Sequence, residues 1–446
     1  MIRQCLRAVI LMTLAPVGLW AQAGGTPASN SPGPAPSANG DAAPLQYPPD
    51  SIRRNFLLLS MATESAYDDN VFSSSQLRRG DLSFHLGPRM VFREERKHLT
   101  LAVDYQPDLL LYRETREFNA FSHGLQLDAR LRLTSRFSLR FADLFNYRVG
   151  IFQPRLSEEV VPAFGPSTSL NPTVFTPLGR QLENNMRLDM VYQKSARTSL
   201  DWFAGFQRLH FGRVVTASSL QDTQRVNAGL EYLYRLDRHN TLGALYLFQE
   251  LSFQQAQRAI VHAALLSFAR QLSPNVTLSV LGGPEYTSLQ DNLTLDPFSF
   301  RATFLIASTR TRWALAGALT KRAKDTEFQI SADRRTSEGG GLLGLVTSSS
   351  INLNVRRRLV GHWNAAWSFT YADHRALAAA QSGSRVRSGA ASFSLERQLS
   401  NNLSARLGYS YIFQSSGDPT LLFADLNRNR VSFGVFYRYH QIPVGR

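Results

Sequence analysis

Hydrophobic and polar residues alternate with a period of two through most of residues 54–440. In the segment 125–133 (LQLDARLRL), the leucines and the alanine share one face, while the glutamine, the aspartate and the arginines share the other. The segment 431–439 (VSFGVFYRY) divides in nearly the same way. Such alternation over about eight residues predicts a β-strand with one apolar and one polar face. Long amphipathic helical patterns are not evident in this region.

Eighteen segments carry this pattern, and the region 288–311 is the least regular. Every second connection is short and polar, as in EERK, TSR and DRHN, whereas the intervening connections are longer and reach their maximum at 148–181. Short turns on one rim and long loops on the other are typical of outer-membrane barrels. The predicted strands are 55–66, 82–93, 98–112, 121–133, 137–148, 182–194, 198–211, 224–236, 240–253, 257–271, 276–287, 310–321, 326–336, 348–358, 363–374, 386–399, 403–414 and 428–440.

So many strands must close or split into smaller sheets, because open twisted sheets rarely exceed about ten strands. A propeller would place four short strands in about 40 residues, whereas here a similar length holds one long hairpin. We therefore predict an all-β fold, a closed antiparallel transmembrane β-barrel of about 18 strands (16–18). Pro88, Pro107 and Pro284 fall inside predicted strands, so we expect bulges or shifted strand ends there.

The N-terminus has the pattern of a secretory signal peptide. Arg3 and Arg7 precede the apolar run 8–20, and the small residues 21–23 predict cleavage after Ala23. Residues 24–53 are rich in proline, alanine and serine and are expected to form a disordered linker. The predicted organisation is a signal peptide (1–23), this linker, a barrel (54–440) and a short tail (441–446), and the predicted location is the bacterial outer membrane.

Composition narrows the chemistry further. Cys5 is the only cysteine and lies in the predicted signal peptide, which argues against disulfides, cysteine catalysis and Cys-ligated metals in the mature chain. The full chain has a formal net charge of +15, carried mainly by arginine. Two explanations stay open, namely contact with acidic glycans or lipid phosphate and arginine usage set by a GC-rich genome. The arginines are spread evenly, which argues against a nucleic-acid partner. We expect no cofactor.

The alternation places a set of arginines on the inner, polar face of the barrel. Inward carboxylates accompany them at Asp128, Asp189, Asp201, Glu231 and Glu327. One interpretation is a salt-bridged lining, and the other is an electropositive pore that favours anions or acidic sugars. The candidate lumen-lining residues are Arg130, Arg132, Arg140, Arg187, Arg225, Arg235, Arg335, Arg356 and Arg406.

The loop 148–181 has two interpretations. It is long enough to fold into the lumen as a constriction, with Glu158 and Glu159 facing the wall arginines. An outward lid fits the same residues.

The last strand resembles the targeting signal that the bacterial barrel-assembly machinery reads. That pattern is polar, any, glycine, any, any, aromatic, any, aromatic, and it fits Ser432, Gly434, Tyr437 and Tyr439. The usual terminal aromatic residue is displaced, because HQIPVGR follows.

The N-terminal barrel region resembles the beta-barrel porin-2 family. The similarity lies in YDDNVF (67–72), GDLSFHLGPRM (80–90), LAVDYQPDLLLY (101–112) and NAFSH (119–123). It implies an outer-membrane barrel, often encoded beside exopolysaccharide or exosortase-type loci, with outer-membrane lipid and lipopolysaccharide as partners. It implies a location and a fold more firmly than a substrate.

Other motifs give weaker signals. Asp68, Asp69 and Asn70 are expected to cap a loop, because such side chains bond the local backbone, with a bound cation such as calcium as the alternative. The segment 339–344 (GGGLLG) matches a dinucleotide-binding pattern, but strands on both sides favour a hairpin loop. The histidines are scattered, among them His210, His262 and His374.

Three functions remain. The first is a porin-like channel for small or oligomeric, anionic solutes, with a link to polysaccharide export as an added hypothesis. The second is a non-conducting structural or adhesion barrel. The third is a barrel-embedded hydrolase of lipid or glycan, which the missing G-x-S-x-G, H-E-x-x-H and P-loop motifs disfavour, so we predict that the protein is not an enzyme.

Overall fold

A computed structural model provides the structure. It describes residues 55–73, 78–149, 175, 179–214, 220–254, 257–295, 302–341, 343–377, 384–416, 425–439 and 442–444. The predicted signal peptide, its cleavage after Ala23 and the whole of the linker lie outside these residues.

The described residues form nineteen strands and one short 3-10 helix, η2 (Arg116–Phe118), between β3 and β4. In this part of the chain no helix is long and apolar enough to cross a membrane. The strands are β1 (Phe56–Asp68), β2 (Asp81–Glu95), β3 (Leu99–Tyr112), β4 (Ala120–Arg132), β5 (Phe137–Val149), β6 (Gly179–Gln193), β7 (Thr198–Val214), β8 (Thr223–Arg235), β9 (Asn240–Phe253), β10 (Arg258–Ser273), β11 (Val276–Leu295), β12 (Ala302–Arg322), β13 (Thr326–Gly339), β14 (Leu343–Arg358), β15 (Trp363–Ala376), β16 (Arg385–Gln398), β17 (Leu403–Ser416), β18 (Leu426–Arg438) and β19 (Ile442–Pro443).

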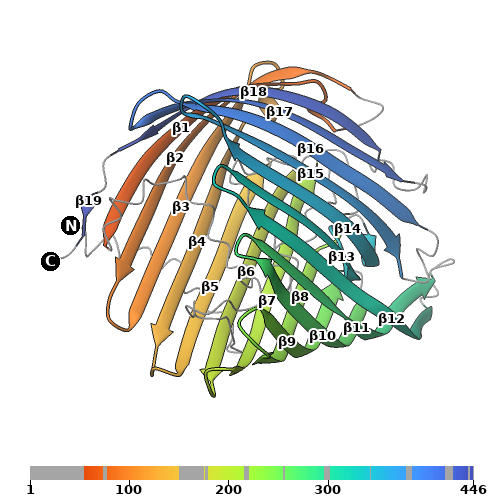
Figure 1. Ribbon diagram of the computed structural model, residues 1–446. Helices are drawn as coiled ribbons and strands as arrows, with labels where there is room; N and C mark the ends of the chain where they lie inside the picture. The colour runs from red at the N-terminus through yellow and green to blue at the C-terminus, as the bar shows by residue number, and fades with distance from the viewer. Residues whose placement is uncertain are drawn as a thin grey trace.

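The first eighteen strands close into one antiparallel barrel, as the sequence predicts (Figure 1). Each strand pairs with its chain neighbours, and β18 pairs with β1 from Ser60 opposite Arg438 to Asp68 opposite Arg430. The short strand β19 adds a brief pairing with the start of β1. Where all eighteen strands pair on both sides, the wall has no unpaired sheet edge, as the hydrocarbon of a membrane requires of a β-structure.

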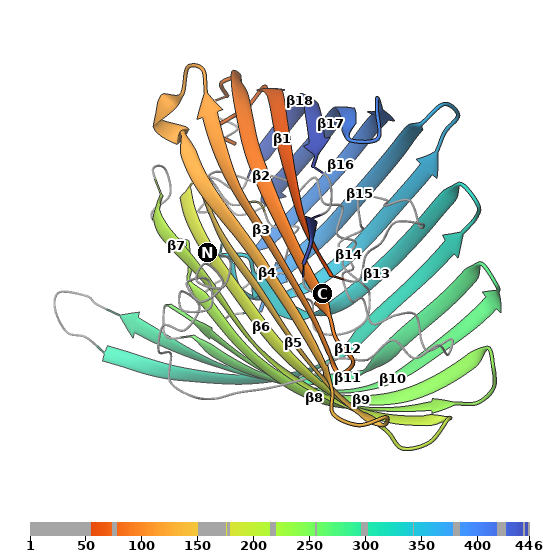
Figure 2. The ribbon, with the colours of Figure 1, turned by 90° about the vertical axis from the view of Figure 1, so that its left-hand side faces the viewer.

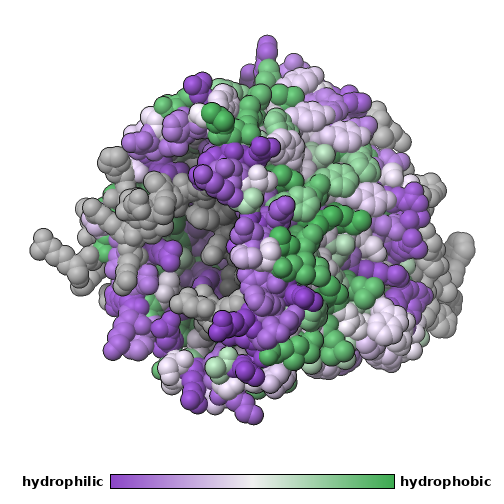
Figure 3. Space-filling view, in the orientation of Figure 1, coloured by the Kyte–Doolittle hydropathy of each residue, from purple (hydrophilic) through white to green (hydrophobic). Residues whose placement is uncertain are grey.

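The apolar positions of the alternation lie on the outside. On β18, Val431 and Phe433 are 48% and 55% exposed, while Ser432 between them is buried. Hydrophobic residues gather in a stripe on the surface seen in Figure 3, with hydrophilic residues on both sides of it. A closed barrel with an apolar outer face is the architecture of outer-membrane proteins. The chain is therefore a bacterial outer-membrane β-barrel.

The wall divides between β12 and β13. Their pairing begins at Leu315 opposite Arg334 and runs only toward the short-turn rim. Beyond that point β12 pairs with β11 alone, and this hairpin projects away from the other strands (Figure 2, the green-cyan arrows at the left). The end of β13 pairs with β14 alone. The region 288–311, irregular in sequence, is thus mostly strand, and β11 and β12 are longer than predicted.

The tip of the β13–β14 hairpin turns into the barrel. We call residues 336–341 and 343–348 the β13–β14 tip, and all of them are buried, on both faces of the hairpin. Leu345 packs against a buried group on the inner face of β9, β10 and β11, which includes Leu251, Val261 and Leu289. This packing explains why β9 and β10 carry apolar residues on both faces, where the alternation is blurred in the sequence.

A second apolar cluster lies on the inner face of β7 and β9–β12. Phe203, Leu245, Leu265 and Leu281 are its largest buried members. Phe203 lies over Gly229 of β8, where any β-carbon would overlap its ring. Gly229 therefore lets the cluster continue from β7 across β8 to β9, and this part of the inner wall is packed.

The expectation of bulges or shifted ends at the three prolines is wrong. Pro88 and Pro107 lie directly across the β2–β3 boundary, where the paired register stops at Leu86 and resumes at Met90 without a shift. Pro284 interrupts the β10–β11 pairing in the same way. Each proline keeps its pairing with the strand on its other side, so the barrel omits a few ladder contacts and stays in register.

Candidate functional site

The nine candidate arginines all lie at inward positions of their strands. Arg225 alternates with the exposed Val226, and Arg406 alternates with the exposed Leu407. The strands β4, β5, β6 and β8 carry Arg130, Arg132, Arg140, Arg187, Arg225 and Arg235, whereas β13, β14 and β17 carry Arg335, Arg356 and Arg406. The set therefore lines the lumen from several directions rather than forming one patch.

The densest charge network spans β4, β5 and β6. Asp128 accepts hydrogen bonds from Nε of Arg130 at 3.1 Å and from Nε of Arg140 at 2.8 Å. Asp189 accepts one from Nε of Arg187 at 2.7 Å, and Nη1 of Arg140 lies 3.9 Å from it. The network alternates in sign, and the side chains of Arg130 and Arg187 keep 32% and 23% of their surface exposed.

Single ion pairs repeat this arrangement elsewhere on the inner face. Arg406 donates to Glu396 between β17 and β16, with Nη2 2.6 Å from Oε2. Nε of Arg335 lies 3.3 Å from Asp333 on its own strand. A salt-bridged lining therefore accounts for many of the inward charges, and Arg130 and Arg187 in it keep part of their side-chain surface exposed.

Arg225 differs from the other candidates because its partner comes from the β13–β14 tip. Its Nη1 lies 3.2 Å from Oε2 of Glu338, and both side chains are almost fully buried. The backbone N–H of Thr336 donates to Glu285 of β11 at 3.1 Å. These bonds attach the tip to the inner face of β8 and β11.

The glycines of GGGLLG allow this packing. Gly341 has φ of +90°, and a β-carbon there would overlap the ring of Phe211 on β7. The backbone N–H of Gln221 donates to the Gly341 carbonyl at 2.9 Å. The segment joins two strands, as expected of a hairpin, but it is buried in the barrel.

One residue of the long loop 148–181 also lies inside the barrel. Phe175 packs with Ile412 and Leu426, and it exchanges two hydrogen bonds with the side chain of Gln414, at 2.9 and 3.0 Å. Ile412 and Gln414 are inward residues of β17, so Phe175 narrows the lumen from the loop side. Glu158 and Glu159 lie outside the described residues.

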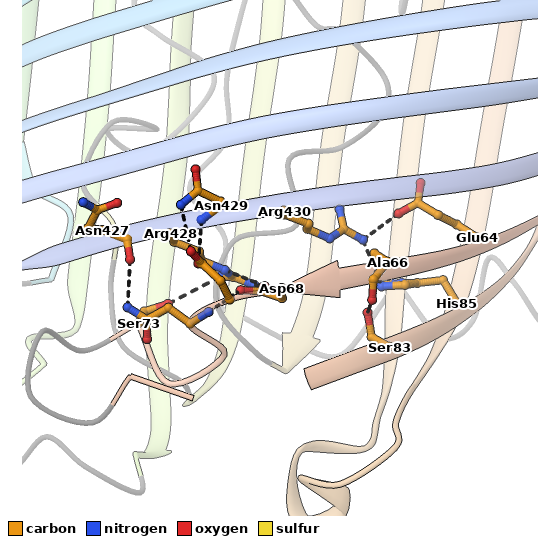
Figure 4. Close-up of polar contacts among 12 residues, drawn as sticks. Glu64, Ala66, Asp68, Ser73, Ser83, His85, Asn427, Arg428, Asn429 and Arg430 are labelled. Carbon is orange, nitrogen blue, oxygen red and sulfur yellow. Dashed lines mark hydrogen bonds and ion pairs between the residues drawn. The ribbon is translucent and has the colours of Figure 1, made fainter. Parts of the chain in front are cut away.

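The aspartates of YDDN fasten the seam between the first and last strands (Figure 4). Asp68 accepts a hydrogen bond from the N–H of Asn70 at 3.0 Å, which is the expected loop-capping bond. It also accepts one from Nε of Arg428 on β18 at 2.6 Å, in a pair almost fully buried. Arg430 pairs with Glu64 one register step further along the seam. The seam contacts were not evident from the sequence.

Asp69 lies in the outer loop just beyond β1. Its carboxylate accepts hydrogen bonds from the backbone and side-chain N–H groups of Asn429, both at 2.7 Å, and pairs with Arg78. Partial burial raises the pKa of Asp69, but the hydrogen bonds from Asn429 and the Arg78 charge outweigh it and leave this pKa below its ordinary value.

The three singled-out histidines lie on different strands. His210 is 2.5 Å from Asp222, His262 bonds the hydroxyl of Tyr246 at 2.8 Å on the outer face, and His374 is fully buried on β15. Among the described residues, no group of three or more His, Cys, Asp and Glu side chains is placed to hold a metal ion.

The motif of the last strand divides between the two faces of β18. Ser432 and Gly434 point inward and Tyr437 points outward, with Tyr439 just beyond the strand end and 52% exposed. A β-carbon on Gly434 would lie 3.2 Å from the Thr63 carbonyl of β1. Recognition by the assembly machinery stays a prediction.

Glu285, Glu338 and Phe175 were missed by sequence reasoning. Only the run GGGLLG signalled an unusual segment near Glu338, because small and apolar residues without charge suit a buried turn. Phe175 gave no signal.

Comparison with protein-family models gives no match, and neither does comparison with curated proteins. The resemblance to the porin-2 family therefore stays a prediction. Similar solved structures include the outer membrane protein OpdK of Pseudomonas aeruginosa (12% identity, TM-score 0.41) and OccK9 (OpdG) of the same organism (12%, 0.43), each covering 86% of this chain and 98% of its own. OccAB4 of Acinetobacter baumannii has 12% identity and a TM-score of 0.41, covering 87% and 99%. Identities and TM-scores this low say nothing about what the chain transports.

Proposed function

We propose that the protein is an outer-membrane channel for small anionic solutes. The observation that carries the proposal is the partly exposed arginine row on β4–β6, formed by Arg130, Arg140 and Arg187. Guanidinium groups that keep part of their surface exposed place positive charge at the lumen, and this charge attracts the carboxylate or phosphate of a passing solute. Arginine-lined constrictions favour anions for this reason.

The filled part of the lumen makes such a channel narrow. The β13–β14 tip and Phe175 both lie inside the barrel wall, toward the rim with the long loops. An unobstructed barrel of this strand number would leave a wide aqueous interior. We infer a selective passage for small solutes rather than a general pore. The link to polysaccharide export and the contact with lipopolysaccharide rest on the sequence resemblance alone.

Planar-bilayer recording tests the proposal. Refolded mature protein should give stepwise conductance, and the reversal potential in a KCl gradient should show preference for chloride. The triple variant R130Q/R140Q/R187Q should lower the anion-to-cation permeability ratio by at least about twofold. The control R258Q removes an arginine paired with Glu250 away from this row and should leave the ratio unchanged. Cation preference in the parent protein would contradict the proposal.

A sealed structural barrel is the second candidate, and the same buried tip favours it. A sealed barrel would be folded and heat-modifiable on gels but would never conduct, even in variants that weaken the attachment of the tip.

A further inference from the structure

Asp201 of β7 and Glu231 of β8 form an acidic pair on the inner face, near the rim with the short turns. The two residues are directly opposite each other in the strand register. Residues so placed on one face of an antiparallel pair have their β-carbons about 4.5–5.5 Å apart. The two carboxylates therefore share one small volume at the wall.

The surroundings of this pair are mostly apolar. Phe203, Leu233 and Leu245 are neighbours on the same face and are 8%, 9% and 6% exposed. Asp201 itself is 5% exposed, whereas Glu231 is only partly buried and opens toward the lumen. Charge in such a setting is poorly solvated, so it needs a partner.

Neither carboxylate forms an ion pair with any residue that the structure describes. Both oxygens of Asp201 are buried and accept no well-formed hydrogen bond, although the Ser199 hydroxyl is close enough to interact with them. Glu231 accepts a long hydrogen bond of 3.5 Å from Ser267. This pair is thus unlike the inward carboxylates of the salt-bridged network.

The charge of Arg187 acts on Glu231, but this arginine is already paired with another carboxylate. Arg187 lies over the ring of Phe203 at 5.0 Å and bonds Asp189 at 2.7 Å. Arg140 joins the same network and is paired with Asp128. Arg130 belongs to this network too, so three arginines and two aspartates leave one net positive charge beside the two carboxylates of the acidic pair, whose charge is compensated only in part.

We propose that Asp201 and Glu231 bind one hard divalent cation of the Ca²⁺ type. Two carboxylates side by side in an apolar wall repel each other and are only partly compensated by the arginine network, and a divalent cation between them removes that repulsion. Ca²⁺ accepts oxygen ligands in flexible geometry. The Ser199 and Ser267 hydroxyls and water supply further oxygens. Two carboxylates make a weak site, with a dissociation constant on the order of 0.1–1 mM. The site does not depend on whether the barrel conducts.

Terbium luminescence tests the site on the unmodified protein. Trp202 and Tyr232 follow the two acids in the chain and are close enough to sensitise a bound Tb³⁺ ion. Refolded mature barrel, prepared without lipopolysaccharide and at neutral pH, should show saturable luminescence that Ca²⁺ displaces and Na⁺ at the same ionic strength does not. Absence of saturable luminescence overturns the proposal, because the pair then holds only a proton.

The variant E231Q locates the ion. It should weaken Tb³⁺ and Ca²⁺ binding at least tenfold, and D201N should do the same. The control E327Q changes another inward glutamate near the same rim, paired with Arg322, and should bind as the parent does. Heat-modifiable gel mobility shows that each variant is folded. Equal binding by folded E231Q, D201N and parent overturns the assignment, whatever conductance the barrel shows.

Discussion

Arg225 and Glu338 form a buried ion pair that joins β8 to β13, strands that are not neighbours in the barrel. Nη1 of Arg225 lies 3.2 Å from Oε2 of Glu338, and the two side chains are 5% and 1% exposed. The pair therefore attaches the β13–β14 tip to the wall at β8. If the tip narrows the lumen, then this pair sets how far it does so.

The variant E338Q should loosen the tip. It leaves Arg225 buried without its counter-charge, and removing one partner of a buried pair costs about 3–5 kcal/mol. Urea unfolding in lipid vesicles should show this loss in the free energy of unfolding. Single-channel conductance should rise, because a detached tip no longer occupies the lumen.

The control for this variant is E327Q. Arg322 and Glu327 form an exposed pair, at 67% and 43%, so the loss should be within about 1 kcal/mol. If E338Q conducts like the parent while losing stability, the tip does not restrict the passage.

The seam gives a second prediction. D68N removes the charge that pairs with Arg428, and both side chains are almost fully buried. The free energy of unfolding should fall by about 3–5 kcal/mol, and folding yields should fall with it, because this pair joins the two ends of the sheet. E114Q breaks an exposed pair with Arg79 and should change stability by less than about 1 kcal/mol. Equal losses of unfolding free energy in D68N and E114Q would show that burial of the Asp68–Arg428 pair does not increase its contribution to stability.

Alternation along the chain was enough to predict the barrel and its strand number. The prediction works because contact with lipid requires an apolar outer face on every strand. The residue pattern of each strand therefore shows which of its faces points outward. The ion-pair partner of a charged residue cannot be predicted in this way. Asp68 and Arg428 are far apart in the chain, and nothing near either residue identifies the other. The hydrogen bond from the N–H of Asn70 to Asp68 was predictable, because the two residues are close together in the chain.

The β13–β14 tip shows a second limit of the sequence. A hairpin that leaves the wall and packs inside it is buried on both faces, so the period of two no longer reports orientation. The same burial makes the inner faces of β9 and β10 apolar, which blurs their pattern. Val261 was correctly predicted as a strand residue, whereas Leu345 lies before the predicted strand 348–358 and was missed, and their packing together requires the structure.

Acid should weaken the outer end of the seam. The pKa of Asp69 is lower in the folded protein than its ordinary value of 3.8, so its carboxylate stabilises the fold at any pH above that ordinary value. This contribution is lost as the pH falls from about 4 through the lowered pKa. The difference in unfolding free energy between the parent and D69N should be constant from about pH 5 to 7 and should shrink below about pH 4. A difference that stays constant down to pH 3 would show that the charge of Asp69 contributes nothing.

Adjacent positions on β4 test which face meets lipid. Leu125 points outward beside Tyr105 and Phe145, whereas Gln126 points inward beside Asp104. Leu125→Arg places a cation near the middle of the strand on the lipid side and should cost about 2–4 kcal/mol of unfolding free energy, or prevent insertion.

Gln126→Arg adds the same charge one residue later, next to a carboxylate in the wetted lumen, and should change stability by less than about 1 kcal/mol. Insertion into lipid vesicles, followed by heat-modifiable mobility and urea unfolding, measures both variants. The two substitutions share side chain, strand and depth, so a difference between them can come only from the face. Equal tolerance of both would mean that the outer surface of β4 does not contact hydrocarbon.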